Sequence, residues 1–475
     1  MVPNMRRRLL LLLLLVPWIG FSQAGYKVYT SHPRIWLHAD RVRRLEKDVE
    51  RNSERWVRLQ RLINQKTTFP EEPLVQALQF QITGNEDAGR LAVEWAKALA
   101  ASPGFAEPVN LRLGAIVYDW CHALLDGDTR DVLAGALGKG AQTITKQTTP
   151  DLASLRSALL AAVAVSGEWD LAPAVTQQIF EGHWEPRILA DLQSGRFLDR
   201  PVELVALLEM MHVSRRNLDR DLWQQAPDVF TPLPMVIMLG TYPEAVRTPE
   251  GLFRQSARPT TAGQADPAVA DAFQRMAEMM LVDYENSSAS YQFLQGWLRH
   301  DLFTLTTPFG APYEFIWLNP YLPGLSYFSA PTVVHDTVRG RLFARRGWQE
   351  DDLWLGYLDG QLQIVADGQL NVIKAADQQP PMVFPGAAVV LARVPMRFKV
   401  EAPDLQAIYV VGLAEGDAYG VKVDRAPFQN VEAGRGGIMV LENRPDKSTI
   451  KIDFDKPVQV QIRSAAKGAS STGSP

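Results

Sequence analysis

The spacing of apolar residues changes once along this chain, near His335, and a single fold class does not accommodate both patterns. From Asp40 to about Asp301, apolar residues recur at intervals of three, four or seven, the period of a helix with one buried face. The first such window, residues 42–63, predicts one helix. Because the breakers between windows are short, we expect antiparallel helical hairpins in this part of the chain.

After His335, apolar and polar residues alternate or form short β-branched runs, which predicts strands. Residues 353–373 carry the turn signals Asp359-Gly360 and Asp367-Gly368, which predict two hairpins. Further strands are expected at residues 387–394, 407–413, 419–424, 437–442, 449–454 and 458–463.

The two patterns together predict an α+β multidomain protein, because 475 residues exceed one ordinary core. The helical domain is expected over residues 25–334 and an antiparallel β-domain over residues 335–464. Residues 465–475 are rich in Ser, Gly and Ala and are expected to be disordered. A hydrophobic content of 46% with 21% charged residues is that of a globular chain.

The first 24 residues predict a signal peptide. Three arginines at residues 6–8 precede an apolar run over residues 9–16, and Ser22-Gln23-Ala24 resembles a cleavage site. The run is shorter than the ~20 residues that span a bilayer, although an uncleaved anchor is the alternative. We therefore expect a periplasmic or secreted protein without a membrane span once the signal is cleaved.

The net charge and the single cysteine limit the classes of partner and the compartment that we expect for this protein. Loss of three arginines with the signal peptide moves the formal net charge from -4 to -7, so no global basic field exists to attract nucleic acid. The sole cysteine, Cys121, excludes an intrachain disulfide and lies in an apolar helical pattern, where it is expected to be buried. Export without a disulfide fits a bacterial periplasm.

A segment rich in proline and aromatic residues, NPYLPGLSYFSAP at residues 319–331, joins the two patterns. Its prolines exclude a continuing helix. Its tyrosines, Tyr321 and Tyr327, follow another aromatic run at residues 313–317. Three interpretations stay open for this segment: a sugar-stacking surface, a loop with a catalytic tyrosine, or a rigid joint between domains.

Three stretches resemble the heparinase II/III-like family of polysaccharide lyases, to which alginate lyases are related. HPRIWLHADRVRRL at residues 32–45 is similar to the opening of many members, and LRLGAIVYDWCHALL at residues 111–125 resembles their helix with the pattern A-x-A-Y-D-W. The junction segment and residues 333–364 resemble the family's passage into its β-domain. The resemblance implies an incomplete (α/α) toroid followed by an antiparallel β-sandwich, and cleavage of acidic polysaccharides by β-elimination.

β-Elimination requires a cation that neutralises the uronate carboxylate, a base for the C5 proton and an acid for the leaving oxygen. The family's usual catalytic motifs are poorly kept here. Residues 148–163 carry Asp151 where members often have an Asn-His element. The predicted loop at residues 181–197 keeps Trp184 and has His183 but no tyrosine, and residues 359–377 contain no histidine.

Most of the candidate site residues therefore lie near the junction in the sequence. The predicted catalytic residues are Tyr321, Tyr327, His335 and Arg341, because cations beside a tyrosine lower its pKa and an arginine fork suits a carboxylate. The predicted substrate-binding residues are Trp184, Tyr313, Trp317 and Arg339. A basic strand edge and packing between domains explain the same residues equally simply.

Other histidines, including His32 and His122, are expected to be structural. The chain has no H-E-x-x-H spacing and no nucleotide-binding loop, so neither a metal nor a cofactor is expected.

Two hypotheses follow for the function. In the first, the protein is an exported lyase with an acidic polysaccharide or oligosaccharide as its partner. In the second, it is a non-catalytic glycan-binding or structural relative of the lyases. A glycosidase is a more distant third, because it requires two carboxylates across one bond and no such pair stands out.

Overall fold

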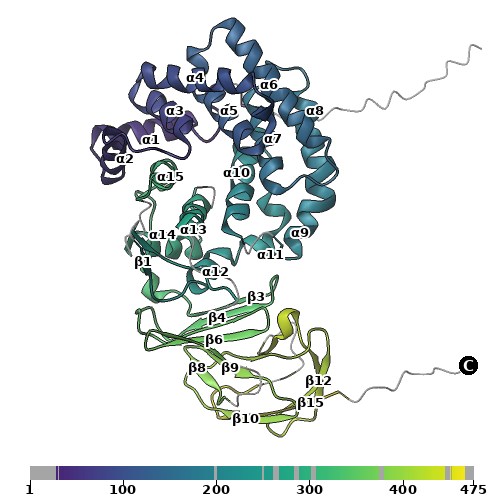
Figure 1. Ribbon diagram of the computed structural model, residues 1–475. Helices are drawn as coiled ribbons and strands as arrows, with labels where there is room; N and C mark the ends of the chain where they lie inside the picture. The colour runs from purple at the N-terminus through teal and green to yellow at the C-terminus, as the bar shows by residue number, and fades with distance from the viewer. Residues whose placement is uncertain are drawn as a thin grey trace, which may run out of the picture.

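The computed structural model describes residues 28–29, 31–196, 200–248, 251–259, 267–282, 288–300, 306–373, 379–443, 450 and 452–465. A helical N-terminal region precedes a C-terminal region of largely antiparallel sheets, as the change in apolar spacing predicts (Figure 1). The predicted signal peptide and residues 466–475 of the predicted tail lie outside the described residues. Among the helices described, none has the length and hydrophobicity to span a membrane.

The helices of the N-terminal region are mostly short. They are α1 (Ala39–Glu50), α2 (Glu54–Asn64), α3 (Glu72–Thr83), α4 (Glu86–Ala100), α5 (Pro108–Trp120), α6 (Gly127–Thr145), α7 (Leu152–Ala164), α8 (Ala172–Gln177), α9 (Leu189–Gln193), α10 (Pro201–Leu218), α11 (Pro227–Phe230), α12 (Leu233–Leu239), α13 (Pro267–Met280), α14 (Ala289–His300) and α15 (Ala311–Trp317).

Helices α5, α7 and α10 form the inner layer of this region, since nearly every described residue of α7 and the second half of α5 is buried. Helix α5 packs on α7, α7 on α10 and α10 on α13, while α3 pairs with α4 on the outside. Helix α15 packs against α2, where Arg55 donates to the carbonyls of Glu314 and Phe315 at 3.3 Å. The helices thus follow an arc, the incomplete toroid that was predicted (Figure 1).

Three local predictions were wrong. Residues 42–63 form two helices, because Asn52 takes a positive φ of 49° and the Ser53 side chain caps α2 by accepting from Trp56. The predicted loop at residues 181–197 is helical up to Gln193, as a π-helix (Gln178–Ile188) continued by α9. The described part of 449–454 forms no strand, because the Asn443 side chain accepts from the backbone of Ile452 at 2.8 Å.

Within the described residues, the strands form three sheets in the C-terminal region and one small hairpin, β1 (Val246–Thr248) with β2 (Gly251–Phe253), within the helical region. The inner sheet has the order β3 (Val333–Asp336), β4 (Arg341–Arg345), β5 (Trp354–Leu358), β6 (Gln361–Ala366), β7 (Gln369–Ile373). The middle sheet has the order β14 (Met439–Glu442), β11 (Ala407–Val411), β9 (Ala387–Leu391), β8 (Met382–Phe384). The outer sheet has the order β10 (Met396–Val400), β15 (Val458–Ser464), β12 (Ala418–Val423), β13 (Gln429–Glu432).

The three sheets are stacked, which explains why their strands differ in pattern. Phe343 and Trp354 of the inner sheet belong to the core of the helical region, while Leu355 packs toward the middle sheet. The other face of the middle sheet, with Ile408, packs on Val460 of the outer sheet. Strand β15 of the outer sheet alternates between buried and exposed residues up to Arg463, because one face of this sheet lies in solvent.

The two predicted hairpins are confirmed. Strand β5 pairs antiparallel with β6, and β6 with β7. Asp359 and Gly360 have φ of 49° and 76°, and Asp367 and Gly368 have φ of 51° and 70°. Two successive positive φ angles are those of a type I′ turn, which Asp-Gly adopts readily. The middle sheet departs from antiparallel pairing once, because β9 and β11 run parallel.

A buried ion network joins the inner helices. Arg112 on α5 donates from Nε and Nη2 to both carboxylate oxygens of Glu209 on α10, at 3.1 and 2.8 Å, and Arg156 on α7 pairs with the same carboxylate. Arg112 also contacts Glu71 at 3.0 Å and the hydroxyl of Tyr313 on α15 at 2.7 Å. Burial alone would raise the pKa of Glu209, but Arg112 and Arg156 bring it down to about 2.

Replacing Glu209 with Gln should lower the free energy of unfolding by about 3–5 kcal/mol, because two buried guanidinium groups lose their anionic partner. Glu203→Gln on the same helix is the matched control. Its partner Arg200 has a side chain that is 74% exposed, and a pair of this kind contributes under about 1 kcal/mol. Urea unfolding of both variants tests this, and equal effects would contradict a structural role for the network.

Candidate functional site

The predicted catalytic tyrosines lie in structural contacts. Tyr321 is 57% exposed, and its hydroxyl donates to Asp48 Oδ1 on α1 at 2.7 Å. Tyr327 is buried, stacked on Phe328 and edge-on to Trp348. Tyr321 thus binds Asp48 of the first helix, a partner outside the predicted set. The junction segment is therefore fastened to the first helix as a joint.

The predicted cations also have partners of their own. Arg341 Nη2 donates to both carboxylate oxygens of Asp359, at 3.0 and 3.1 Å, and Arg339 forms an ion pair with Asp336. The ring of His335 on β3 packs edge-on to Tyr409, with 5.8 Å between centroids. The structure thus gives each of these groups a partner outside the predicted set.

The predicted sugar-stacking residues need correction. Trp184, Tyr313 and Trp317 are at most 1% exposed, so none presents a ring face on which a sugar could stack. Trp184 Nε1 donates to Gln225 at 2.6 Å, and Trp317 packs between Trp36 and His212. The apolar spacing of these three residues predicts that they face the core. It does not show whether an edge of each ring stays exposed to solvent.

The two N-terminal motifs contact each other directly. Asp119, fully buried at the end of α5, accepts hydrogen bonds from the backbone amides of Arg34, at 3.0 and 2.9 Å, and of Ile35, at 2.7 Å. It also lies 2.6 Å from His32 Nδ1. Trp120 Nε1 donates to the Ile35 carbonyl at 2.8 Å. The Y-D-W triplet therefore holds the H-P-R-I-W segment in place.

Arg34 extends this contact to α7. Its Nη1 donates to the carbonyls of Val163 and Ser166 at 3.1 and 2.8 Å, where α7 ends, and its Nη2 lies 2.7 Å from His32 Nε2. Because a guanidinium can only donate, His32 Nε2 accepts from Arg34, and Nδ1 carries the proton and donates a hydrogen bond to Asp119. One carboxylate thereby fixes both the tautomer and the orientation of His32.

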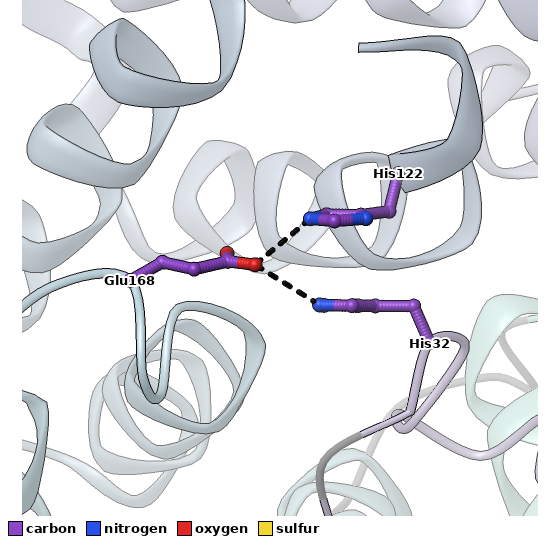
Figure 2. Close-up of side chains that lie close together, drawn as sticks. All are labelled: His32, His122 and Glu168. Carbon is purple, nitrogen blue, oxygen red and sulfur yellow. Dashed lines mark hydrogen bonds and ion pairs between the residues drawn. The ribbon is translucent and has the colours of Figure 1, made fainter. Parts of the chain in front are cut away.

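The histidine cluster, which consists of His32, His122 and Glu168, lies beside this contact (Figure 2). The two imidazole rings stack with 3.8 Å between centroids and 7° between planes. Glu168 Oε1 lies 2.9 Å from His122 Nε2 and 3.6 Å from His32 Nε2, and Tyr118 donates its hydroxyl to Oε2. The side chains of the cluster are 12%, 19% and 24% exposed, so solvent reaches all three.

The electrostatics of the cluster favour a neutral imidazole beside a carboxylate. Burial and the neighbouring His32 lower the pKa of His122. Burial alone would raise the pKa of Glu168, but the hydrogen bond from Tyr118 and the histidines hold it below its usual range. Burial and the bond to Glu168 raise the pKa of Tyr118. A neutral base, a carboxylate and a protonated phenol therefore lie together at neutral pH.

Two imidazoles and a carboxylate are also ligand types for zinc, with Asp119 as a second carboxylate that orients His32. The geometry does not fit a metal ion well. Nitrogen lone pairs lie in the ring planes, so those of two parallel rings run side by side and do not converge. The Arg34 guanidinium also occupies His32 Nε2. As arranged, the cluster suits proton transfer better than coordination.

Sequence reasoning treated His32 and His122 as structural and did not select Glu168. The available signal was that each histidine belongs to one of the two N-terminal motifs that resemble the same family. Cys121, next to His122, is buried as predicted, and burial raises the pKa of its thiol to about 12.

The sequence matches no protein-family model. No curated protein matches it either. Among solved structures, the chain is similar to a mutant heparan sulfate lyase from Pedobacter heparinus, with 13% identity and a TM-score of 0.35 over 63% of this chain and 47% of the lyase. The chain thus spans about half the length of that enzyme. It is also similar to a glycoside hydrolase, with 12% identity and a TM-score of 0.32 over 94% of this chain and 79% of the hydrolase. Likeness at this level is not evidence of a shared activity.

Replacing Asp119 with Asn should destabilise the protein by about 2 kcal/mol or more, because an amide N–H₂ would then face buried backbone donors. In this variant, hydrogen exchange at the amides of Arg34 and Ile35 should become faster than in the unaltered protein. The increase should be larger there than at other amides of the helical region. Asp128→Asn in the exposed first turn of α6 is the control and should change neither quantity measurably. Unchanged protection at Arg34 and Ile35 in the Asp119 variant would contradict the assigned role.

Proposed function

We propose that this chain is an exported, glycan-active protein that cleaves a uronate-containing polysaccharide by β-elimination, with the histidine cluster as its acid–base centre. The observation that carries the proposal is the partly exposed, neutral imidazole of His122, hydrogen-bonded to Glu168 and stacked on an oriented His32. The choice of an acidic polysaccharide rests on the resemblance of the two N-terminal motifs, both of which build this cluster.

His122 is the proposed base. Its imidazole takes the C5 proton of the uronate, the C–H electrons form the C4–C5 double bond, and the C4–oxygen bond breaks. The imidazolium that forms is stabilised by Glu168 and can return its proton to the leaving oxygen.

Arg130 on α6 is the proposed partner of the uronate carboxylate. It lies close enough to lower the pKa values of His122 and Tyr118. Within the described residues its side chain donates to the Leu125 carbonyl, at 3.4 Å, and has no carboxylate partner.

The alternative is a non-catalytic, glycan-binding relative of the lyases. The observation in its favour is that the arginines predicted to meet a carboxylate, Arg339 and Arg341, are already paired with Asp336 and Asp359. Such a protein would bind uronate polymers and release no unsaturated product.

Purified protein should release unsaturated uronate product, followed by its ultraviolet absorbance, from at least one of alginate, polygalacturonate and heparan sulfate. Replacing His122 with Gln should lower turnover by about 10² or more, the usual scale for an acid–base group, and Glu168→Gln should act in the same direction.

Glu181→Gln is the matched control, because Glu181 is exposed and its carboxylate accepts a hydrogen bond from the exposed Gln177 on the same helical segment. It should keep full turnover. Unchanged turnover in the His122 variant would contradict the assignment of the base. Binding of a uronate polymer without product would favour the non-catalytic alternative.

A further inference from the structure

The exposed face of the outer sheet gathers basic residues, although the chain as a whole is acidic. Outward positions on β10, β15 and β12 carry Arg397, Arg463 and Lys422, while their neighbours Phe398, Val460 and Val421 turn into the sandwich. Figure 1 shows these strands at the end of the molecule far from the helices. This basic face, defined by Arg397, Lys422 and Arg463, is therefore distinct from the histidine cluster.

Strand register brings the three cations together. Arg397 and Lys422 are both paired with Gln461, on opposite sides of β15. Neighbouring strands lie about 4.8 Å apart, so the two cations are separated by about 10 Å across an amide side chain. Arg463 pairs with Gly420, two positions from Lys422 on the same face. Cations at such intervals, with amides between them, suit a polymer that carries repeated negative charges.

Two cations of this face lie over one aromatic ring. The Arg463 guanidinium lies 3.9 Å from the centroid of Phe428, and the Lys422 ammonium lies 6.0 Å from the same ring. Gly420 lets Arg463 lie flat, since a Cβ there would come within 3.3 Å of its side chain. Among the residues the structure describes, none forms an ion pair with these three cations, and the Arg397 guanidinium instead donates to Gln459 at 2.9 Å.

We propose that the basic face of the outer sheet is a second binding surface, separate from the catalytic centre, that holds an extended acidic polysaccharide. The anionic character of the ligand follows from the face itself, and the choice of a polysaccharide rests on the proposed function. A surface of this kind raises the local concentration of the polymer and leaves the chemistry to the histidine cluster.

The test compares binding of alginate by two triple variants, each of which removes three positive charges. The face variant is Arg397→Gln, Lys422→Gln and Arg463→Gln. The control variant is Arg90→Gln, Lys97→Gln and Lys139→Gln, which removes exposed cations from α4 and α6. The face variant should lose roughly tenfold or more in alginate affinity at low salt, and the control variant less than about twofold.

The affinity of the unaltered protein for alginate should fall as salt rises, because exposed ion pairs are screened. Dextran, a neutral polymer, should not bind. Equal losses in both triple variants would overturn the proposal, since they would reflect net charge alone. Single-stranded DNA that bound this face as tightly as alginate would also overturn it.

Turnover on a short uronate oligosaccharide separates this proposal from the proposed function. The face variant should keep that turnover. If no variant shows turnover yet the face variant alone loses alginate binding, the proposed lyase activity fails and the binding surface stands.

Discussion

The bidentate pair between Arg112 and Glu209 is the interaction on which the helical region depends most. It lies where α5, α7 and α10 meet. Arg156 from α7 is a second cation on Glu209, and Glu71, which pairs with Arg112, supplies the second negative charge. A buried carboxylate without its cations is strongly destabilising, so the three helices can pack only in the register that joins these groups. Seven residues further along α5, about 10 Å at the helical rise, Asp119 fixes the histidine cluster. Helix α5 therefore carries both the network and the residue that orients His32 in the candidate site.

The sequence was most informative about the β-domain. Alternation of apolar and polar residues indicates a strand with one buried and one exposed face. The sequence predicted β12, β15 and the two Asp-Gly hairpins, whose turn geometry is local. It was less informative where side chains replace backbone partners, as Asn443 does for Ile452. Helices were predicted by their windows, but the break at Asn52 depends on one left-handed residue and one serine cap.

The candidate site was predicted poorly for a physical reason. Arginines and tyrosines at the junction were considered by their chemistry alone, but their partners, such as Asp48 and Asp359, are set by tertiary contacts that spacing does not encode. The residues that do converge, His32, His122 and Glu168, come from three segments that only the folded chain brings together. The motifs containing the histidines were visible in the sequence, but their mutual contact was not.

The most direct test of the histidine cluster as the acid–base centre is an NMR titration of its imidazoles, with and without a uronate oligosaccharide. His122 should titrate below the ordinary histidine value of about 6.5, because burial and His32 disfavour its charged form. Added oligosaccharide should shift the His122 resonances more than those of the buried His183. A midpoint at or above about 6.5, with resonances that do not respond to the oligosaccharide, would contradict the assignment.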